Sequence, residues 1–511
     1  MGTRADITLL LEGTYPYVRG GVSSWVHQLI RGLSDFSFSL VFIGSRPEDY
    51  GKQVYVFPDN VVHFEAHYLN DAWQMKCPSR QRGDAEAYAR SRELHDLFQV
   101  EGARMPRELV SDVLGCLGEE GGISHASFLY SQCSWENTTR AYEKYSQDPS
   151  FLNYFWTVRS MHAPLFMLAE IARNVPKTSV VHSVSTGYAG LLGAMIRNRH
   201  PETCFFLTEH GIYTKERKID LAQARWISDG ELGETEGIIM ENGFLRDMWI
   251  RFFEVMGRMT YQMADRIFAL YEGNRLRQIN DGAAFSKTAV IPNGIDLELY
   301  HDALARRPQS IPRVIGLIGR VVPIKDIKTF IRTIYYARQA MPEVEGWIIG
   351  PDDEDPGYAS ECRELVDSLG LADAIQFKGF QRVTEMLPQI GVMALTSISE
   401  AQPLVILEAY AGGVPCVCTD VGGCRAMIEG GEVPEDRALG LSGAIVSIAD
   451  PEATAEACIR LMSEENLWRQ ASDAAVARVN RFYSETLVFE RYRHLYQTAL
   501  EMQGECAAWP V

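Results

Sequence analysis

The chain has 511 residues, of which 46% are hydrophobic and 23% charged, and its formal net charge is −18. At about 150 residues per domain, this length predicts two large domains or three smaller ones, each able to bury its own core. The acidic balance argues against a surface for nucleic acid, although a few local cations suffice to bind a small anionic ligand. The composition therefore indicates a folded multidomain protein without nucleic acid as a partner.

Cysteine usage and hydropathy bear on the compartment. The ten cysteines occur without C-x-x-C spacing, which is typical of thiols in a reducing cytoplasm rather than of a secreted disulfide framework. The N-terminal apolar run is short and is interrupted by Glu12, so we expect no signal peptide. Residues 178–196 carry no formal charge, but five of them are Ser or Thr, which disfavours a membrane span. These features predict a cytoplasmic protein.

Along the chain, short apolar runs alternate with amphipathic segments, as in parallel α/β sheets. The strands expected before residue 275 are ITLLLEG, FSLVFIG, VVHFEAHYL, SVVHSV, CFFLTEH and RIFALY. A Gly-containing loop follows the first of them and leads into a helix over residues 22–33. Between about residues 70 and 153 the alternation gives way to charge-mixed helical sequence, which indicates an insertion in the first domain.

A second series of strands begins after IPNGID, at residues 291–296. Its expected strands are RVIGLIGR, EGWIIGP, AIQFKGF, GVMALTS, VPCVCTD and GAIVSI. The α/β pattern predicts two Rossmann-like, doubly wound domains, residues 1–298 and 299–480, which face each other across a cleft, with a helical segment at 481–511. Ligands of such sheets bind at the carboxyl ends of the strands, so the loops there carry the candidate site residues.

Two of these loops have the chemistry of an anion site. Gly20 and Gly21 follow the first strand, where paired glycines let the backbone approach a ligand; a tight turn with a serine cap is the alternative. Arg320 and Lys325 flank the turn after the first strand of the second domain, just before a helix that starts near Asp326. Two such cations neutralise a diphosphate without a metal, whereas the alternative is a pair of solvated loop residues.

A third loop contains two glutamates eight residues apart. Glu400 follows the strand GVMALTS, and Pro403 is well placed for the first turn of a helix. Glu408 lies within that helix on apolar ground, where a buried carboxylate requires a hydroxyl or amide partner. Because acidic residues are frequent in this chain, the context of the pair carries the inference and the spacing does not.

GGVSSW, IPNGID, GRVVPIKD and SEAQPLVILEAYAGGVP, in this order, resemble the retaining family-4 glycosyltransferases of the GT-B fold. The first 35 residues, the helical insertion and TEHGIY at residues 208–213 further resemble the glycosyltransferases of Pel exopolysaccharide synthesis. The resemblance implies a hexosyltransferase that moves a sugar from UDP-N-acetylhexosamine or UDP-glucose to a growing exopolysaccharide of a biofilm matrix. One departure is Ala401, where many relatives carry glycine.

The resemblance also implies roles for residues on these strand-end loops. The catalytic residues that it implies are His210, Arg320, Lys325 and Glu400. The residues that it implies for donor binding are Gly20, Gly21, Arg320, Lys325, Lys378, Phe380, Leu404, Val405 and Glu408. In these roles the two cations, the paired glycines and the amides of Leu404 and Val405 serve the diphosphate, and Glu408 binds the ribose. Glu400 and His210 serve the donor sugar, and the loop of Lys378 and Phe380 serves the base.

No metal or other cofactor is expected, because the cations around the diphosphate are side chains. Asp353 and Asp355 form the D-x-D pattern of metal-dependent GT-A enzymes, but they follow an entire domain, and a solvated turn is the favoured interpretation. Two alternative functions stay open: a UDP-sugar epimerase of the same fold, which needs no acceptor, and a non-catalytic regulator that binds a nucleotide sugar. The partners implied by the resemblance are a UDP-sugar, a polysaccharide acceptor and inner-membrane proteins of polysaccharide synthesis and export, which would hold the protein peripherally at that membrane.

Overall fold

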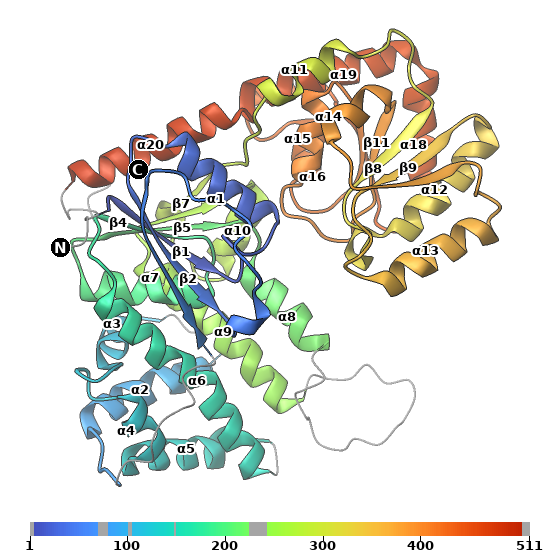
Figure 1. The fold of residues 1–511 in the computed structure, drawn as a ribbon. Helices are drawn as coiled ribbons and strands as arrows, with labels where there is room; N and C mark the ends of the chain where they lie inside the picture. The colour runs from blue at the N-terminus through green and yellow to red at the C-terminus, as the bar shows by residue number, and fades with distance from the viewer. Residues whose placement is uncertain (1–4, 70–79, 101–104, 148–149, 224–242, 503–511) are drawn as a thin grey trace. The chain divides into compact units, whose positions relative to one another are not determined.

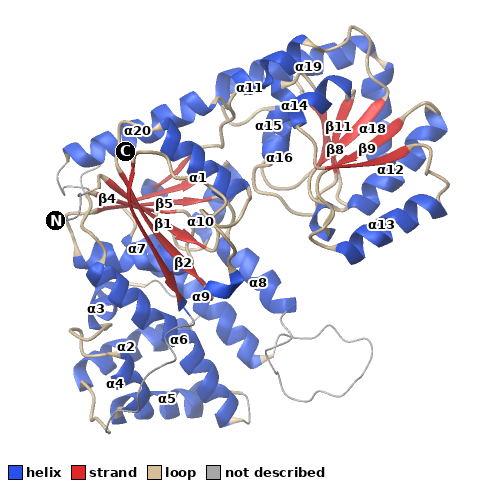
Figure 2. Cartoon of the chain, in the orientation of Figure 1, coloured by secondary structure: helices blue, strands red, loops and turns tan. Residues whose placement is uncertain are grey.

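The computed structural model describes residues 5–69, 80–100, 105–147, 150–223 and 243–502 (Figures 1 and 2). The chain divides into two compact units. Unit 1 comprises Met1–Ala269, Arg275–Ala289 and Tyr492–Val511, and unit 2 comprises Leu270–Asn274 and Val290–Arg491. The chain therefore leaves unit 1 and returns to it twice.

The described part of unit 1 is built on a seven-stranded sheet in the order β3-β2-β1-β4-β5-β6-β7. The strands are β1 (Ile7–Glu12), β2 (Phe38–Gly44), β3 (Val61–Tyr68), β4 (Val180–Ser183), β5 (Cys204–Glu209), β6 (Arg266–Ala269) and β7 (Thr288–Val290). Strand β1 pairs in parallel with β2 on one side and with β4 on the other, so the strand order reverses between β1 and β4. The central strands are apolar along their length because helices cover both faces of the sheet.

The helices of unit 1 are α1 (Gly21–Gly32), α2 (Ala85–Phe98), α3 (Arg107–Cys116), α4 (His125–Tyr130), α5 (Gln132–Tyr145), α6 (Phe151–Asn174), α7 (Tyr188–Arg199), α8 (Tyr213–Gln223), α9 (Phe244–Met263) and α10 (Glu272–Asn280), whose first three residues belong to unit 2. Helices α2 to α6 occupy the chain between β3 and β4, where the sequence predicts the insertion, and α6 contacts both α7 and α9 (Figure 1). One core cluster joins Val41 and Phe205 of the sheet to Leu192 of α7 and Met256 of α9.

The described part of unit 2 contains a six-stranded parallel sheet in the order β10-β9-β8-β11-β12-β13. The strands are β8 (Val314–Ile318), β9 (Glu345–Ile349), β10 (Ile375–Gly379), β11 (Val392–Leu395), β12 (Cys416–Thr419) and β13 (Gly443–Val446). The helices are α11 (Glu298–Ala305), α12 (Ile327–Ala340), α13 (Pro356–Ser368), α14 (Val383–Met386), α15 (Leu404–Ala411), α16 (Cys424–Glu429), α17 (Pro434–Arg437), α18 (Pro451–Ser463), α19 (Glu465–Phe482) and α20 (Glu485–Glu501). Two core clusters, around Phe330 and around Tyr410, hold the sheet and its helices together. The prediction of two doubly wound parallel sheets is confirmed (Figure 2).

The last helix, α20, spans the boundary between the units, and its residues from Tyr492 onward belong to unit 1. The Tyr496 hydroxyl forms a hydrogen bond of 2.6 Å with Nδ1 of His182 in β4. His182 Nε2 in turn lies 2.8 Å from the Thr208 hydroxyl in β5, which is 3.0 Å from the Tyr492 hydroxyl. Burial lowers the pKa of His182 to about 3, so this chain of hydrogen bonds is neutral at physiological pH.

Two of the compartment signals can be compared with the structure. In the described part of the chain, the cysteines that are free thiols are Cys116, Cys133, Cys362, Cys416, Cys418, Cys424 and Cys458. Cys204 is disulfide-bonded, so the expectation of thiols is wrong at that position. Of the helices that the structure describes, none is both long and apolar enough to cross a bilayer.

Candidate functional site

In unit 2 the strand order reverses between β8 and β11, and the loops that follow these two strands meet there. The Thr396 hydroxyl, directly after β11, donates hydrogen bonds of 3.0 Å to the carbonyls of Lys325 and Asp326. The two loops thereby bring Lys325 and Glu400 together, with 2.5 Å between Nζ and Oε1. Their side chains are only 18% and 14% exposed. A largely buried ion pair therefore occupies the crevice at which doubly wound sheets bind their ligands.

Helix α12 begins beside this pair, and the side chain of its N-cap residue caps its N-terminus. Asp326 is the N-cap, and its carboxylate accepts a 3.2 Å hydrogen bond from the Thr329 amide. It adopts a left-handed backbone (φ 45°), which aspartate tolerates better than most residues. A carboxylate at this position repels an anion, so the N-terminus of α12 is unsuited to a phosphate.

Helix α15, which follows the neighbouring loop, lacks such a side-chain cap at its N-terminus within the described chain. It begins at Leu404 after Pro403, and no side chain among the described residues caps it. The amides of its first turn, those of Leu404 and Val405 included, therefore lie at an uncapped helix N-terminus, where the macrodipole favours a negative charge. Glu400, the partner of Lys325, lies four residues before this helix, so the loop that leads into α15 carries both the ion pair and the uncapped helix start.

The loop after β12 fixes the backbone of Glu400 and Ala401. The Gly423 amide donates a 2.7 Å hydrogen bond to the Ala401 carbonyl. Gly422 has φ +55°, and a Cβ added there would lie 2.3 Å from the Glu400 carbonyl oxygen, so this close approach requires glycine. Ala401 does not have a positive φ, so its backbone is one that alanine adopts readily.

Glu408 lies on the second turn of α15. The Tyr300 hydroxyl of α11 donates a 3.1 Å hydrogen bond to its Oε1, which confirms that this buried carboxylate has a hydroxyl partner. Burial raises the pKa of Glu408 above its usual value. The carboxyl is thus held in place as a polar group in an otherwise apolar wall.

Among the described residues, no hydrogen bond joins Arg320 to the Lys325–Glu400 pair. Its Nη1 lies 2.6 Å from both carboxylate oxygens of Glu354, in the loop after β9, and both side chains are about half exposed. Glu354 stands between the two aspartates of the D-x-D pattern. Asp355 caps α13 by accepting a 3.0 Å hydrogen bond from the Tyr358 amide. Within the described ranges no three His, Cys, Asp or Glu side chains gather as metal ligands would.

Lys378 and Phe380 lie at the end of β10. Lys378 Nζ is 4.0 Å from the centroid of the Trp347 ring and 2.5 Å from Gln376 Oε1. Gly379 has φ +62° and turns the chain, and Phe380 then exposes 77% of its surface. The phenyl ring is available for stacking on a planar group.

In unit 1, Gly20 and Gly21 lie between β1 and α1. Gly20 is the N-cap of α1, with an extended φ of 169° and no side-chain cap. A Cβ added at either glycine would meet no described atom within 4 Å. The alternative of a serine cap is wrong, since Gly20 itself precedes the helix and Ser23 is buried in its first turn. Packing among the described residues therefore does not require glycine at either position.

His210 directly follows β5. Its ring lies edge-on to Trp25 of α1, with 4.6 Å between centroids. Burial lowers its pKa to about 4, so the imidazole is neutral at physiological pH. Its Nε2 is buried and has no hydrogen-bond partner among the described residues.

Two glutamates at strand ends of unit 1 were not predicted as site residues. Glu209, before His210, accepts hydrogen bonds from the Tyr261 hydroxyl (2.6 Å), the Gln278 amide (2.9 Å) and the Thr186 hydroxyl (2.9 Å). Burial raises its pKa to about 7. The sequence signal that could have identified Glu209 is an acidic residue at the end of the apolar run CFFLTE.

Glu12 ends β1 in the same way, after the apolar run ITLLLE. It accepts a 3.1 Å hydrogen bond from the Ala189 amide at the start of α7 and a 3.0 Å bond from the Tyr213 hydroxyl. Glu12 therefore lies where the strand order of unit 1 reverses, between β1 and β4, and ties the first turns of α7 and α8 to the sheet.

Two family models match the chain, one on either side of the passage from unit 1 to unit 2 near residue 290. Residues 5–286 match a family model described as "Domain of unknown function (DUF3492)", and residues 312–464 match that of "Glycosyl transferases group 1". An exopolysaccharide phosphotransferase of Streptomyces coelicolor is 32% identical over 210 residues, which are 40% of this chain and 20% of the relative. A D-inositol 3-phosphate glycosyltransferase of Corynebacterium urealyticum is 27% identical over 228 residues, which are 41% of this chain and 52% of the relative. The chain thus spans between a fifth and about half of the length of these relatives.

Solved structures resemble the chain over nearly its whole length. Anabaena HepE, in complex with UDP and glucose, has a TM-score of 0.58 at 14% identity over 97% of this chain and 100% of its own. A sucrose-phosphate synthase of Thermosynechococcus elongatus has a TM-score of 0.56 at 16% identity over 97% of this chain and 99% of its own. At such identities the likeness establishes the fold, which is the GT-B fold of two Rossmann-like domains.

Proposed function

Because this chain belongs to the family of the domain of unknown function DUF3492 and its residues 312–464 form a group 1 glycosyl transferase domain, we propose that it is a retaining glycosyltransferase. It transfers a hexosyl group from a UDP-sugar, UDP-N-acetylhexosamine or UDP-glucose, to a growing exopolysaccharide. The observation that carries the proposal is the uncapped N-terminus of α15 beside the buried Lys325–Glu400 pair at the strand-order reversal of unit 2.

The chemistry follows from charge. As the bond to the sugar breaks, negative charge accumulates on the leaving diphosphate, and Lys325 and the first amides of α15 stabilise it. Preorganised donors of this kind contribute about 3 to 4 kcal/mol each. Glu400 keeps Lys325 in place and offers a carboxylate to a donor-sugar hydroxyl. The leaving phosphate itself takes the proton of the acceptor, so that the substitution proceeds on one face of the sugar without a carboxylate nucleophile.

The donor and the acceptor class draw support from the relatives. HepE is a structural neighbour whose complex holds UDP and glucose, and one sequence relative is called an exopolysaccharide phosphotransferase. The first 35 residues and TEHGIY resemble PelF, which favours a Pel-type polymer of the biofilm matrix. On this proposal the protein works at the cytoplasmic side of the inner membrane, through membrane partners that export the polymer.

The test is to incubate the purified full chain with a panel of UDP-sugars, with and without oligosaccharide acceptors, while UDP release and sugar identity are followed. Transfer with retained anomeric configuration is the expected result. Conversion of the UDP-sugar without acceptor would instead identify an epimerase, and binding without turnover a regulator. Absence of UDP binding would overturn the proposal.

We also propose that transfer is metal-independent, because Lys325 and backbone amides supply the positive charge that a cation would otherwise supply. We expect saturating EDTA to leave the rate of UDP release nearly unchanged. A loss of rate that magnesium or manganese restores would contradict this and would favour a role for Asp353 and Asp355 as metal ligands.

A further inference from the structure

A cavity of about 480 Å³ lies among helices α2, α5, α6 and α9 of unit 1. This volume is that of pockets for small organic molecules. Aromatic side chains form much of its wall, among them Tyr154 and Phe166 of α6 and Phe244 and Phe252 of α9. None of the residues that we assign to the glycosyltransferase site lines it, so a ligand bound here leaves that site free.

Two histidines in the wall face each other, with 3.0 Å between Nε2 of His95 and Nε2 of His162. In each ring Nδ1 lies 2.7 Å from a main-chain carbonyl, of Ser91 and of Val158 respectively. The distance between the two Nε2 atoms is that of an N–H···N hydrogen bond, so one ring donates its Nε2 proton to the other. Burial lowers the pKa of both rings, that of His162 to about 3, so both are neutral at physiological pH. The two rings thus form an uncharged, hydrogen-bonded pair in the cavity wall, and they add planar surface to its lining.

The charged side chains around the cavity are mainly cationic, in a chain whose net charge is −18. The cations that line it are Arg92, Arg140, Lys144 and Arg251, and the carboxylates are Asp96 and Asp247. Asp96 is already engaged, since Arg140 lies 2.9 Å from it and the Tyr145 hydroxyl donates to it at 2.8 Å. The excess of positive charge favours an anionic group at the rim.

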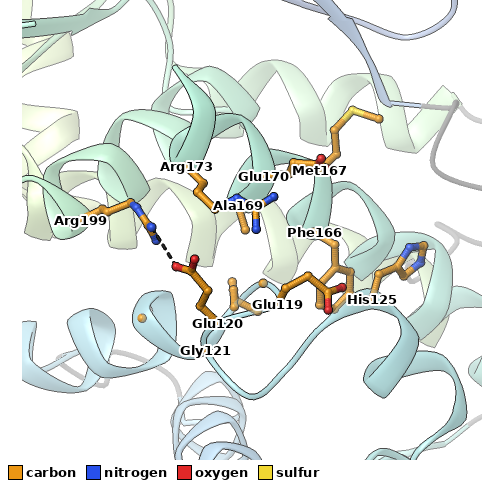
Figure 3. Close-up of a pocket in the computed structure, with 13 residues that line it drawn as sticks. Glu119, Glu120, Gly121, His125, Phe166, Met167, Ala169, Glu170, Arg173 and Arg199 are labelled. Carbon is orange, nitrogen blue, oxygen red and sulfur yellow. Dashed lines mark hydrogen bonds and ion pairs between the residues drawn. The ribbon is translucent and has the colours of Figure 1, made fainter. Parts of the chain in front are cut away.

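A second cavity of unit 1, of about 500 Å³, has the opposite charge and provides an internal comparison (Figure 3). Its lining carries Glu119, Glu120 and Glu170 against Arg173 and Arg199. Arg199 is paired with Glu120 at 2.8 Å, as the dashed line in Figure 3 marks. Two cavities of similar size therefore differ in the sign of their charge, and an anion is expected in the first alone.

We propose that the cavity among α2, α5, α6 and α9 binds a small, planar aromatic anion. The ring packs against the aromatic wall of α6 and α9. The anionic group lies toward the cations of the lining, Arg251 among them. Because this site shares no residue with the glycosyltransferase site, it stands or falls independently of the proposed activity.

The probe is 1-anilinonaphthalene-8-sulfonate, which combines an aromatic body, one N–H group and one sulfonate. Isothermal titration of the full chain is expected to reveal one saturable site. Arg251→Gln, at an exposed position, should weaken binding about tenfold or more, the scale of one charge-assisted hydrogen bond. The matched control is Arg173→Gln, which removes a cation from the other cavity and should leave the affinity unchanged.

A second ligand distinguishes the contribution of the anionic group to the binding affinity from that of the apolar contact. N-phenyl-1-naphthylamine has the same rings and N–H group without the sulfonate, so its affinity should be the same for the wild type and for Arg251→Gln. The proposal is overturned if the wild type has no saturable site for the sulfonate, if Arg173→Gln weakens binding as much as Arg251→Gln, or if Arg251→Gln binds the sulfonate like the wild type.

Discussion

Lys325 and Arg320 are both expected to serve the donor diphosphate, but their surroundings differ. Lys325 is 18% exposed and already faces Glu400, whereas Arg320 is 53% exposed and pairs with Glu354. An ion pair on the surface contributes only about 0 to 1 kcal/mol, so Arg320 leaves Glu354 at little cost. On the proposed function, Lys325 would be the preorganised cation, and Arg320 would be recruited when the donor binds.

This difference leads to a prediction for substitutions. Lys325→Ala should lower turnover about a hundredfold or more, because it removes a fixed positive charge from the leaving group and leaves Glu400 unpaired. Arg320→Ala should lower turnover on the same scale, since its charge also matters more as the bond breaks, and Arg320→Lys should restore only part of it. The measurements are turnover and UDP affinity, with Lys328→Ala as control, because Lys328 is not an assigned site residue and pairs with Glu361 of α13. Wild-type turnover in both Lys325→Ala and Arg320→Ala would contradict the assignment.

Glu209 allows a prediction about pH. Its folded pKa of about 7 lies above the ordinary 4.5, so the folded state holds its proton more tightly than the unfolded state does. The stability that this gives is complete below pH 4.5 and is lost as the pH rises through 7, by about 3 kcal/mol in all. We expect the melting temperature of the wild type to fall relative to that of Glu209→Gln over this range. Parallel melting profiles of the two proteins would rule this out.

The sequence allows a prediction of which strand-end loops meet, but not of which side chains pair within them. Glu400 and Lys325 follow apolar strands, and the rule for doubly wound sheets brings such loops together. The partner of Arg320 is 34 residues away and that of Glu408 is 108 residues away, on elements whose approach only the folded chain reveals. The sequence therefore indicates which side chains point at the crevice, and tertiary packing determines which of them pair.

At the scale of elements, the strands of both sheets could be predicted because parallel strands buried on both faces are continuous apolar runs. Strand β7 (Thr288–Val290) was missed, since three residues are too few to form a pattern. The start of α15 was displaced by one position, because Pro403 serves as N-cap and the helix begins at Leu404. The sequence does not distinguish the N-cap from the first helical residue when a proline suits both positions.

Substitutions of the two glycines before α1 should change activity without lowering stability. Gly20→Ala and Gly21→Ala add a methyl group that meets no described atom within 4 Å, so the melting temperature should be unchanged or slightly higher. Turnover should fall about tenfold or more if the donor approaches this backbone, because the methyl group displaces it from the reactive position. Gly51→Ala is the control, as its Cβ is equally unobstructed within the described chain. Full activity of both variants would remove the glycines from the site.

For the whole molecule, one of the passages of the chain from unit 1 to unit 2 falls between residues 289 and 290, just before the segment 290–296. Asn293 is held to unit 2, since its amide donates a 2.6 Å hydrogen bond to Gln402 Oε1 just before α15. A donor bound at α15 therefore acts on the segment that leads back to unit 1, and we expect the units to close when UDP binds. Small-angle scattering should record a smaller radius of gyration with saturating UDP in the wild type but not in Lys325→Ala. An unchanged radius in the wild type would contradict closure.

The passage of α20 back into unit 1 has a consequence for how the protein is made. His182 and Thr208 meet the hydroxyls of Tyr496 and Tyr492, which follow them by 314 and 284 residues. On a ribosome, the sheet of unit 1 emerges early, and His182 and Thr208 have each other but lack the two tyrosine hydroxyls while all of unit 2 is translated. A nascent chain that ends at Arg491 would thus contain every residue of unit 2 and still lack the segment that completes this hydrogen-bonded chain, so the sheet formed first obtains its last buried partners only when synthesis is nearly finished.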